Sequence, residues 1–355
     1  MSKEIKKTDG RGFISGEYIM RNQDIDKDQW LRDSFPEWGT FLNREIEERV
    51  VPKGEVSLWW CGGPSWVVKT DEGGIFFVDM YSGPSMYTEL HYCGVCKQSG
   101  AESINWIRLN PQVIDPWEFK QLDGVFCTHS HQDHCDLYSV KATLKTTDCM
   151  YYAPPHTVNK LKGFQVPDER IVMAKVGESV KVKGAEVDFL ICYDQTAIKT
   201  GVGDVLMPYE ECACCFLFKT SAGNILFMGD TWYHDGYIQI RENYDIDIAI
   251  FDMGSNAPGA TDKMPPYDCA RLGPVLGAKL LIPDHYDNWR NTAGDPELLV
   301  NQFERIVKEN SPEIKTVIMR CGGRFDYPAD QDIGRYRYPD GSEHYNFSKS
   351  AFAKK

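Results

Sequence analysis

The most informative segment, Gly124-Val-Phe-Cys-Thr-His-Ser-His-Gln-Asp-His134, passes from an apolar run directly into four potential metal ligands. Residues 124–128 are apolar and β-prone, and they predict a buried strand. After the ligands, Asp136 is placed to cap a helix that we expect to reach about Leu144. Side chains held between a strand end and a helix start are rigid enough for metal coordination.

The four candidate ligands in this segment are His129, His131, Asp133 and His134. The chain has only eight histidines, so three within six positions are poorly explained as solvated loop residues. Imidazole and carboxylate groups suit divalent ions such as Zn, Mn and Fe. The spacing therefore predicts a metal site, with enough ligands to serve two ions.

Two later residues repeat the same placement at a strand end. Asp230 follows the apolar run 225–229, and His285 follows the run 280–284. A two-metal site needs about three protein ligands per ion and a bridging carboxylate. We predict that Asp230 is the bridge and that His285 is a further ligand, because separate strands that each end in a ligand can converge on one centre.

Composition excludes several other classes of function. The net charge of −13 argues against a nucleic-acid or anionic-membrane partner. Residues 1–11 lack the apolar core of a secretory signal, and no later stretch is long enough to span a membrane. We expect a cytoplasmic protein with a small-molecule substrate.

The twelve cysteines are scattered through predicted strands, and we interpret them as reduced, buried thiols. One pair, Cys93-Gly-Val-Cys96, follows His91 and has the spacing of a metal or redox motif. It lacks a second CxxC pair, so a structural loop is the favoured interpretation.

The chain has no repeats and no linker, which predicts one domain over residues 1–355. A helical extension at about 24–51 should pack on its outside, and a loop at about 80–119 should border the site. Helices are expected at 157–162, 267–276 and 296–310. Strands are expected at 56–61, 66–69, 75–79, 124–128, 150–153, 170–174, 180–183, 186–193, 213–219, 224–228, 246–251, 279–282 and 316–319.

The ligand segment, with Gly229-Asp230-Thr231 and His285, resembles the signature of the metallo-β-lactamase superfamily. Its L-ascorbate 6-phosphate lactonase (UlaG-type) branch is similar over nearly the whole chain. That resemblance implies an α/β fold, an αββα sandwich of two mixed sheets flanked by helices, with a dinuclear site between the sheets. It also suggests a homo-oligomer. The runs that carry the branch assignment are Phe35-Pro-Glu-Trp-Gly39, 128–134, Asp194-Gln-Thr-Ala197, Thr261-Asp-Lys-Met264 and Cys321-Gly-Gly-Arg-Phe325.

The resemblance also assigns ligands to the two ions. It makes His129 and His131 ligands of the first metal, and it makes Asp133, His134 and His285 ligands of the second, with Asp230 between them. One first-metal position is open. Asp194, at the end of a predicted strand, is favoured over His156, whose Pro-Pro-His-Thr setting indicates a helix start. Water is the third alternative.

The implied reaction is hydrolysis of a phosphorylated sugar lactone such as L-ascorbate 6-phosphate, with Mn or Zn as the expected ion and Fe as an alternative. Asp133 would orient the attacking water, and His234 is a candidate proton donor. Lys97, Lys263 and Arg324 are candidate anchors for the phosphate. The alternatives are a small phosphodiester or cyclic-nucleotide hydrolase, and a non-hydrolytic metal-binding or redox protein on the same fold.

Overall fold

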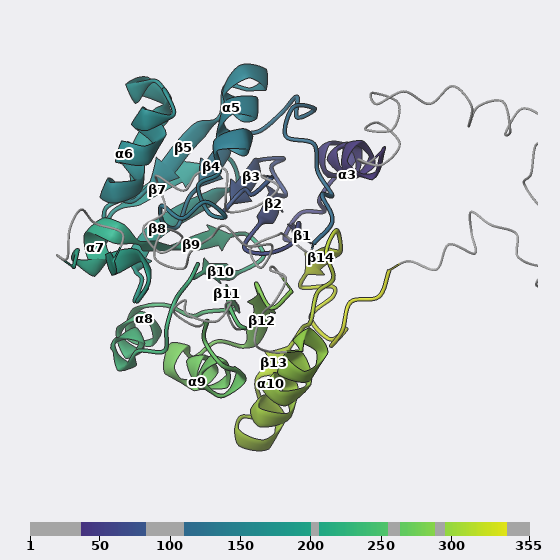
Figure 1. The fold of residues 1–355 in the computed structure, drawn as a ribbon. Helices are drawn as coiled ribbons and strands as arrows, with labels where there is room; N and C mark the ends of the chain where they lie inside the picture. Colours follow the sequence, from purple (N-terminus) through teal and green to yellow (C-terminus); the bar gives the residue numbers. More distant parts are fainter. Residues whose placement is uncertain (1–36, 83–109, 200–205, 255–262, 288–294, 339–355) are drawn as a thin grey trace, which may run out of the picture. The chain divides into compact units, whose positions relative to one another are not determined.

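The computed structural model describes residues 37–82, 110–199, 206–254, 263–287 and 295–338. Contacts within the chain divide it into two units, Met1–Trp38 with Arg337–Lys355, and Gly39–Tyr336. Both sheets and all the described candidate site residues belong to the second unit (Figure 1).

The first sheet has seven strands and changes from antiparallel to parallel pairing at its centre. The three strand pairs at one end, formed by β14, β1, β2 and β3, are antiparallel, and the pairs that involve β4, β5 and β6 are parallel. In spatial order the strands are β14 (Arg324–Tyr327), β1 (Val56–Trp60), β2 (Trp66–Thr70), β3 (Ile75–Val78), β4 (Gly124–Phe126), β5 (Met150–Ala153) and β6 (Ile171–Met173).

The second sheet repeats this design with seven more strands. The pairs among β7 to β10 are antiparallel, and the pairs from β10 to β13 are parallel. In spatial order the strands are β13 (Lys315–Thr316), β12 (Leu280–Asp284), β11 (Ile248–Asp252), β10 (Asn224–Phe227), β9 (Cys214–Thr220), β8 (Ala185–Ile191) and β7 (Ser179–Val182). Two mixed sheets confirm the predicted fold class.

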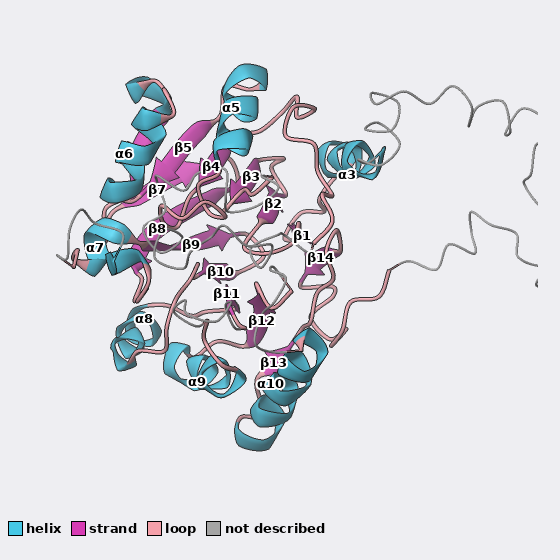
Figure 2. Cartoon of the chain, in the orientation of Figure 1, coloured by secondary structure: helices cyan, strands magenta, loops and turns pink. Residues whose placement is uncertain are grey.

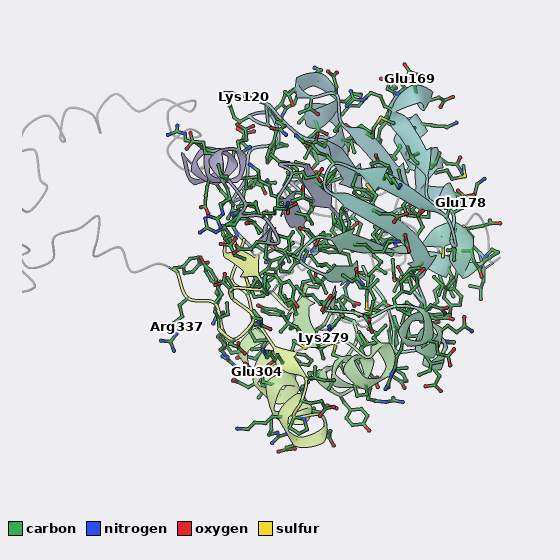
Figure 3. The ribbon with its side chains drawn as sticks, turned by 180° about the vertical axis from the view of Figure 1, so that it is seen from behind. Lys120, Glu169, Glu178, Lys279, Glu304 and Arg337 are labelled. Carbon is green, nitrogen blue, oxygen red and sulfur yellow. The ribbon has the colours of Figure 1, made fainter. Side chains whose placement is uncertain are left out.

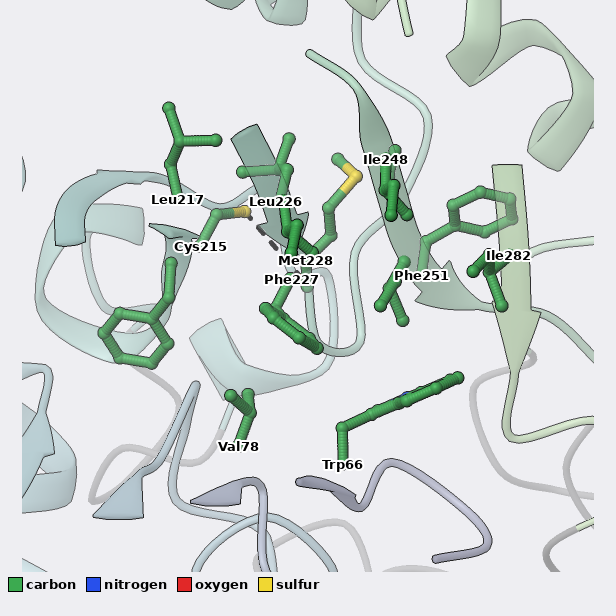
Figure 4. Close-up of a cluster of buried hydrophobic side chains, with 14 of the residues drawn as sticks. Trp66, Val78, Cys215, Leu217, Leu226, Phe227, Met228, Ile248, Phe251 and Ile282 are labelled. Atoms are coloured by element: carbon green, nitrogen blue, oxygen red, sulfur yellow. Dashed lines mark hydrogen bonds between the residues drawn. The ribbon is translucent and has the colours of Figure 1, made fainter. Parts of the chain in front are cut away.

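Alternation along the first sheet divides its side chains between two cores. Leu58, Trp60 and Val68 join the core between the sheets, whereas Trp59 and Val67 join a second core beneath the helices. Figure 4 shows the contact between the sheets, where Trp66 and Val78 of the first sheet point toward Phe227 and its neighbours on the second. The two sheets therefore meet face to face, and their strand ends lie close enough to build one site.

Helices cover the outer faces of both sheets (Figures 1 and 2). Leu42 and Ile46 of α3 (Glu37–Glu48) pack in the outer core of the first sheet, with residues of α5 (Leu137–Thr146) and α6 (Pro155–Gly163). The second sheet is covered by α8 (Ile238–Asn243), α9 (Pro266–Leu276) and α10 (Pro296–Asn310). Short elements complete the described chain: α7 (Tyr209–Cys212), η3 (Asp168–Arg170), η4 (Ala197–Lys199) and η5 (Asp235–Tyr237).

The strongest local signals in the sequence are confirmed. Asp136 caps α5 by accepting from the Ser139 backbone N–H at 2.9 Å, and α10 has the predicted bounds. The predicted strand 316–319 was wrong in extent, because β13 has only two residues before Ile318 forms an isolated bridge to Arg335. Strand β14 was not predicted.

Surface and buried groups divide as the composition suggests. Charged side chains such as Glu169, Glu178 and Lys279 lie at the periphery (Figure 3). The described cysteines are buried, as predicted for structural thiols, while Cys93 and Cys96 lie outside the described residues. Among the described helices, none combines the length and apolarity needed to cross a membrane.

Candidate metal centre

Four strand ends deliver the candidate ligands to one buried place. The segment His129–His134 follows β4, Asp194 follows β8, Asp230 follows β10, and His285 follows β12. All of these side chains are buried. Side chains at the carboxyl ends of strands from two facing sheets converge because the sheets share one core.

The first group of ligands is centred on His129. Its Nε2 atom lies 2.9 Å from Nδ1 of His131 and 3.9 Å from Oδ2 of Asp230. On its other side, His129 Nδ1 lies 3.6 Å from Oδ2 of Asp194. Asp194, the residue favoured for the open first-metal position, therefore lies beside His129.

The second group is centred on Asp230. Its Oδ1 atom lies 3.1 Å from Nε2 of His134 and 3.0 Å from Nε2 of His285. Asp133 Oδ2 lies 3.8 Å from the same two nitrogens. Two sets of three ligand atoms, His129–His134–Asp230 and Asp133–His134–His285, each lie within 4.8 Å of one another. Asp230 faces both groups, as a bridging carboxylate must.

Asp79 contacts both Thr128 and His134 in the first-sheet ligand segment. It accepts hydrogen bonds from the Thr128 backbone N–H and hydroxyl, each at 2.7 Å. Its Oδ2 also lies 2.8 Å from Nδ1 of His134, which leaves Nε2 to face Asp230. Asp79 has a positive φ of 52°, a conformation that Asp tolerates better than most residues. A carboxylate on the far nitrogen of a ligand histidine sets both its tautomer and its orientation.

Asp284 performs the same task for His285. Asp284 Oδ1 lies 2.7 Å from Nδ1 of His285, and its Oδ2 accepts from the Trp66 indole N–H at 2.9 Å. Trp66 belongs to the first sheet, so the orientation of a second-sheet ligand depends on the facing sheet. His285 itself has a φ of 61°, and strained backbone of this kind clusters at functional sites.

Close backbone contacts hold the two halves of the site together. The Cys214 backbone N–H donates to the Thr128 carbonyl at 2.9 Å. Gly229 has a positive φ of 56°, and a Cβ there would lie 2.5 Å from Oγ1 of Thr128, which explains the Gly before Asp230. On the other side, the buried Lys160 ammonium donates to the Ser130 carbonyl at 2.9 Å.

Burial keeps the first-group ligands ready to bind a cation. Desolvation, aided by the charge of His134, holds the pKa of His129 well below its ordinary value. Desolvation also lowers the pKa of His131 to about 4, so both rings are neutral near pH 7. For Asp194, desolvation and then the charge of Asp230 raise the pKa to about 6. Metal ligands must be deprotonated, and these three are deprotonated at neutral pH.

In the second group, the charges of neighbouring residues together outweigh the effect of burial on the pKa values. Burial, and then Lys263, lower the pKa of His285, but Asp230 and Asp284 outweigh them and raise it to about 9. Burial raises the pKa of Asp230, whereas Lys263 and then His134 pull it well below its ordinary value. Lys263 Nζ contacts Oδ2 of Asp230 directly. The carboxylates of this group are therefore balanced by the charge of His285 and by the Lys263 ammonium.

The residues present fit a divalent metal. Nε2 of His131 and Oδ2 of Asp194 are buried and have no hydrogen-bond partner among the described residues. Buried polar atoms without partners are rare in folded proteins, and a cation satisfies both. The donor set contains only imidazole and carboxylate groups, which suit Zn, Mn or Fe.

Neither His156 nor His234 belongs to the groups of possible ligand atoms found among the described residues. His156 is in the first turn of α6, and the charge that lowers its pKa, after burial, is that of Lys160. His234 is exposed, stacks on Tyr193 at a centroid distance of 3.7 Å, and accepts from the Gly236 N–H to cap η5. These contacts favour a structural role for His234 over the predicted role as a proton donor.

The three predicted phosphate anchors differ in their surroundings. Arg324 lies on β14 and pairs with Glu45 at 2.9 Å and Asp326 at 3.2 Å, contacts that favour a structural role over the predicted phosphate anchor. Lys263 does reach the centre, but its ammonium is engaged by Asp230. Lys97 lies outside the described residues.

Three buried carboxylates were not singled out from the sequence: Asp79, Asp252 and Asp284. Each lies at or just beyond the end of a strand, the placement that identified Asp230. The strand-end rule would have found all three, but nothing in the local sequence distinguishes a carboxylate that orients a ligand from one that binds metal.

Solved structures share this arrangement of sheets and helices. The isothiocyanate hydrolase from Delia radicum gut bacteria has a TM-score of 0.55 and 16% identity, covering 76% of this chain and 98% of its own. CmlA, a diiron beta-hydroxylase from Streptomyces venezuelae, has a TM-score of 0.52 and 15% identity, covering 78% of this chain and 54% of its own. At these identities the likeness concerns the fold alone, which is the fold of a class of metal-dependent hydrolases and related metalloenzymes.

The sequence comparisons are narrower. The profile of the Beta-lactamase superfamily domain matches residues 101–286. A probable L-ascorbate-6-phosphate lactonase, UlaG, from Escherichia coli O45:K1 is 33% identical over 333 residues, covering 89% of this chain and 94% of the relative. The chain therefore belongs to the beta-lactamase superfamily, in the branch that contains UlaG, and it is a hydrolase of that fold.

Proposed function

We propose that this protein is a metal-dependent lactonase that opens L-ascorbate 6-phosphate or a related phosphorylated sugar lactone. The observation that carries the proposal is the buried cluster of imidazoles and carboxylates built around Asp230. The similarity to UlaG over most of both chains supplies the substrate class. A small-molecule substrate, a cytoplasmic location and a homo-oligomer belong to the same proposal.

The metal residues divide between two ions. His129, His131 and Asp194 would hold the first, with Asp230 shared. Asp133, His134 and His285 would hold the second. Bound divalent ions would supply Lewis acidity toward the lactone carbonyl and lower the pKa of water. Mn or Zn is the expected ion, and Fe is the alternative.

The protein supplies orientation and charge. Asp79 and Asp284 fix the far nitrogens of His134 and His285, so that both Nε2 atoms face Asp230. Burial raises the pKa of Asp133, but the charge of His134 helps to lower it below its ordinary value, so this carboxylate stays ionised. An ionised Asp133 at the centre can accept a proton or orient a polar hydrogen of the bound substrate.

The test begins with turnover. Purified protein loaded with Mn²⁺ or Zn²⁺ is given L-ascorbate 6-phosphate, the unphosphorylated lactone and bis(p-nitrophenyl) phosphate, and ring opening is followed by NMR. We expect the phosphorylated lactone to be preferred. Asp230→Ala should remove several kcal/mol of transition-state stabilisation, a loss of more than about 10³-fold in kcat/KM.

The matched control is His234→Asn, which keeps a side-chain acceptor for the Gly236 N–H. This variant should retain wild-type turnover, since His234 lies outside the ligand cluster. Preferred hydrolysis of the phosphodiester would favour the rival hydrolase. Full activity in Asp230→Ala would contradict the proposal, and so would a metal-loaded protein that is redox-active but inert toward every ester.

A further inference from the structure

Asp252 is a buried carboxylate that nothing in the site description explains. It ends β11, in register with Asp284 on β12, and is fully buried. Both of its carboxylate oxygens lack a hydrogen-bond partner among the described residues. Burial raises the pKa of Asp252 well above its ordinary value, and the charge of Lys263 opposes that rise. A buried carboxyl group without a hydrogen-bond partner is rare in folded proteins and calls for one.

Lys263 is the candidate partner for Asp252, because the two side chains interact electrostatically. The Gly254 backbone N–H donates to the Met264 carbonyl at 3.1 Å, which places the segment carrying Lys263 against the end of β11. The Lys263 side chain is 8% exposed, and its ammonium contacts Oδ2 of Asp230. The charges of Asp230 and Asp252 both raise the pKa of Lys263 against the effect of burial, so both residues favour its charged form.

Lys263 and a divalent ion compete for the same acceptor. Asp230 is the carboxylate that faces both groups of ligands, and an ammonium on its Oδ2 offsets the negative charge that attracts a metal. Like charges at contact distance repel strongly in a buried site. An ammonium displaced from Asp230 needs another acceptor, because an unpaired buried cation is as costly as an unpaired carboxylate.

We propose that Asp252 is a positioning residue that accepts the Lys263 ammonium when Asp230 binds a divalent cation. The two carboxylates thus share one lysine, and Asp252 sets how readily Asp230 is released to the metal. The inference rests on the proposed metal centre but not on the substrate. Asp252 itself is not a metal ligand in this arrangement.

The test is a double-mutant cycle read by metal affinity. Metal-free wild type, Asp252→Asn, Lys263→Met and the double variant are titrated with Zn²⁺ or Mn²⁺ against a chromophoric chelator. Asp252→Asn should weaken binding about tenfold or more, the usual range for residues that act through a ligand. Lys263→Met should tighten binding, because the competing charge is gone. In the Lys263→Met background, Asp252→Asn should have no further effect.

Each alternative outcome is decisive. Weaker binding in Lys263→Met would mean that the lysine organises Asp230 rather than competing for it, and would overturn the proposal. An equal loss from Asp252→Asn in both backgrounds would show that Asp252 acts without Lys263. Thermal melts of the metal-free variants identify any that do not fold, and Lys263→Met alone still tests the direction of the effect. Metal affinity is independent of turnover, so failure of the lactonase proposal would appear separately.

Discussion

The two sheets contribute to the metal centre in different ways. After β4, one six-residue segment supplies four candidate ligands, and its support, Asp79, comes from the neighbouring strand β3. The second sheet supplies one ligand from each of three strands, and Trp66 of the facing sheet helps to orient one of them. The first half of the centre is therefore a local motif, whereas the second exists only when the sheets are packed together.

The largest difference we expect between the two regions is their response to pH without metal. Burial raises the pKa of Asp194 from 3.8 to about 6. Its contribution to stability is therefore fully present below about pH 4 and is lost as pH rises through 6. His131 has a pKa lowered from 6.5 to about 4, so its contribution is present above 6.5 and is lost as pH falls through 4.

Asp194→Asn should therefore gain stability relative to wild type as pH rises, by up to about 3 kcal/mol at pH 7. The measurement is urea unfolding of chelator-treated protein at pH 4 and pH 7. His131→Gln, which replaces a first-sheet ligand, is the matched variant and should not gain stability between these values. If the stability of wild type and Asp194→Asn changed equally with pH, burial would not raise the pKa of Asp194 in the folded protein.

The second prediction concerns the orientation of His285, which depends on Asp284 and, through it, on Trp66 of the facing sheet. Asp284→Asn should present the wrong hydrogen-bonding group to His285 and weaken metal binding about 10–100-fold. Trp66→Phe should act in the same direction but less strongly, because it removes one donor to Asp284. Both affinities can be measured by competition with a chelator.

Trp59→Phe is the control for the Trp66 substitution. Trp59 lies on a neighbouring strand but on the outer face of the sheet, where its indole N–H donates to Glu45 at 3.2 Å. It should leave metal affinity unchanged. If Trp66→Phe and Trp59→Phe behaved alike, the facing sheet would have no part in orienting His285.

The smallest effect is predicted for Arg324→Ala. Its side chain is 35% exposed and pairs with Glu45 and Asp326, so its loss should cost at most about 1 kcal/mol of stability. Metal affinity and the KM for a phosphorylated lactone should not change. A raised KM with unchanged stability would restore Arg324 as a phosphate anchor and extend the site toward β14.

Prediction from sequence succeeded where the signal was local. Long apolar runs such as 213–219 and 224–228 became β9 and β10, and Asp136 capped its helix. Strand β14 was missed because Arg324 and Asp326 interrupt its apolar pattern, and both are satisfied by partners distant in sequence. The short helices α7 and α8 have too few residues to show helical periodicity.

The sequence by itself identified the segment 129–134 and the ends of the strands that carry Asp230 and His285, because adjacency and periodicity are local properties of the chain. The fold class followed from the resemblance to a known family. Only the tertiary structure decided that Asp194 approaches His129. It alone paired Lys263 with Asp230. It also paired Trp66 with Asp284, which lies 218 positions further along the chain. Such contacts arise when two sheets bury a common face, and no short-range pattern encodes which polar groups then meet.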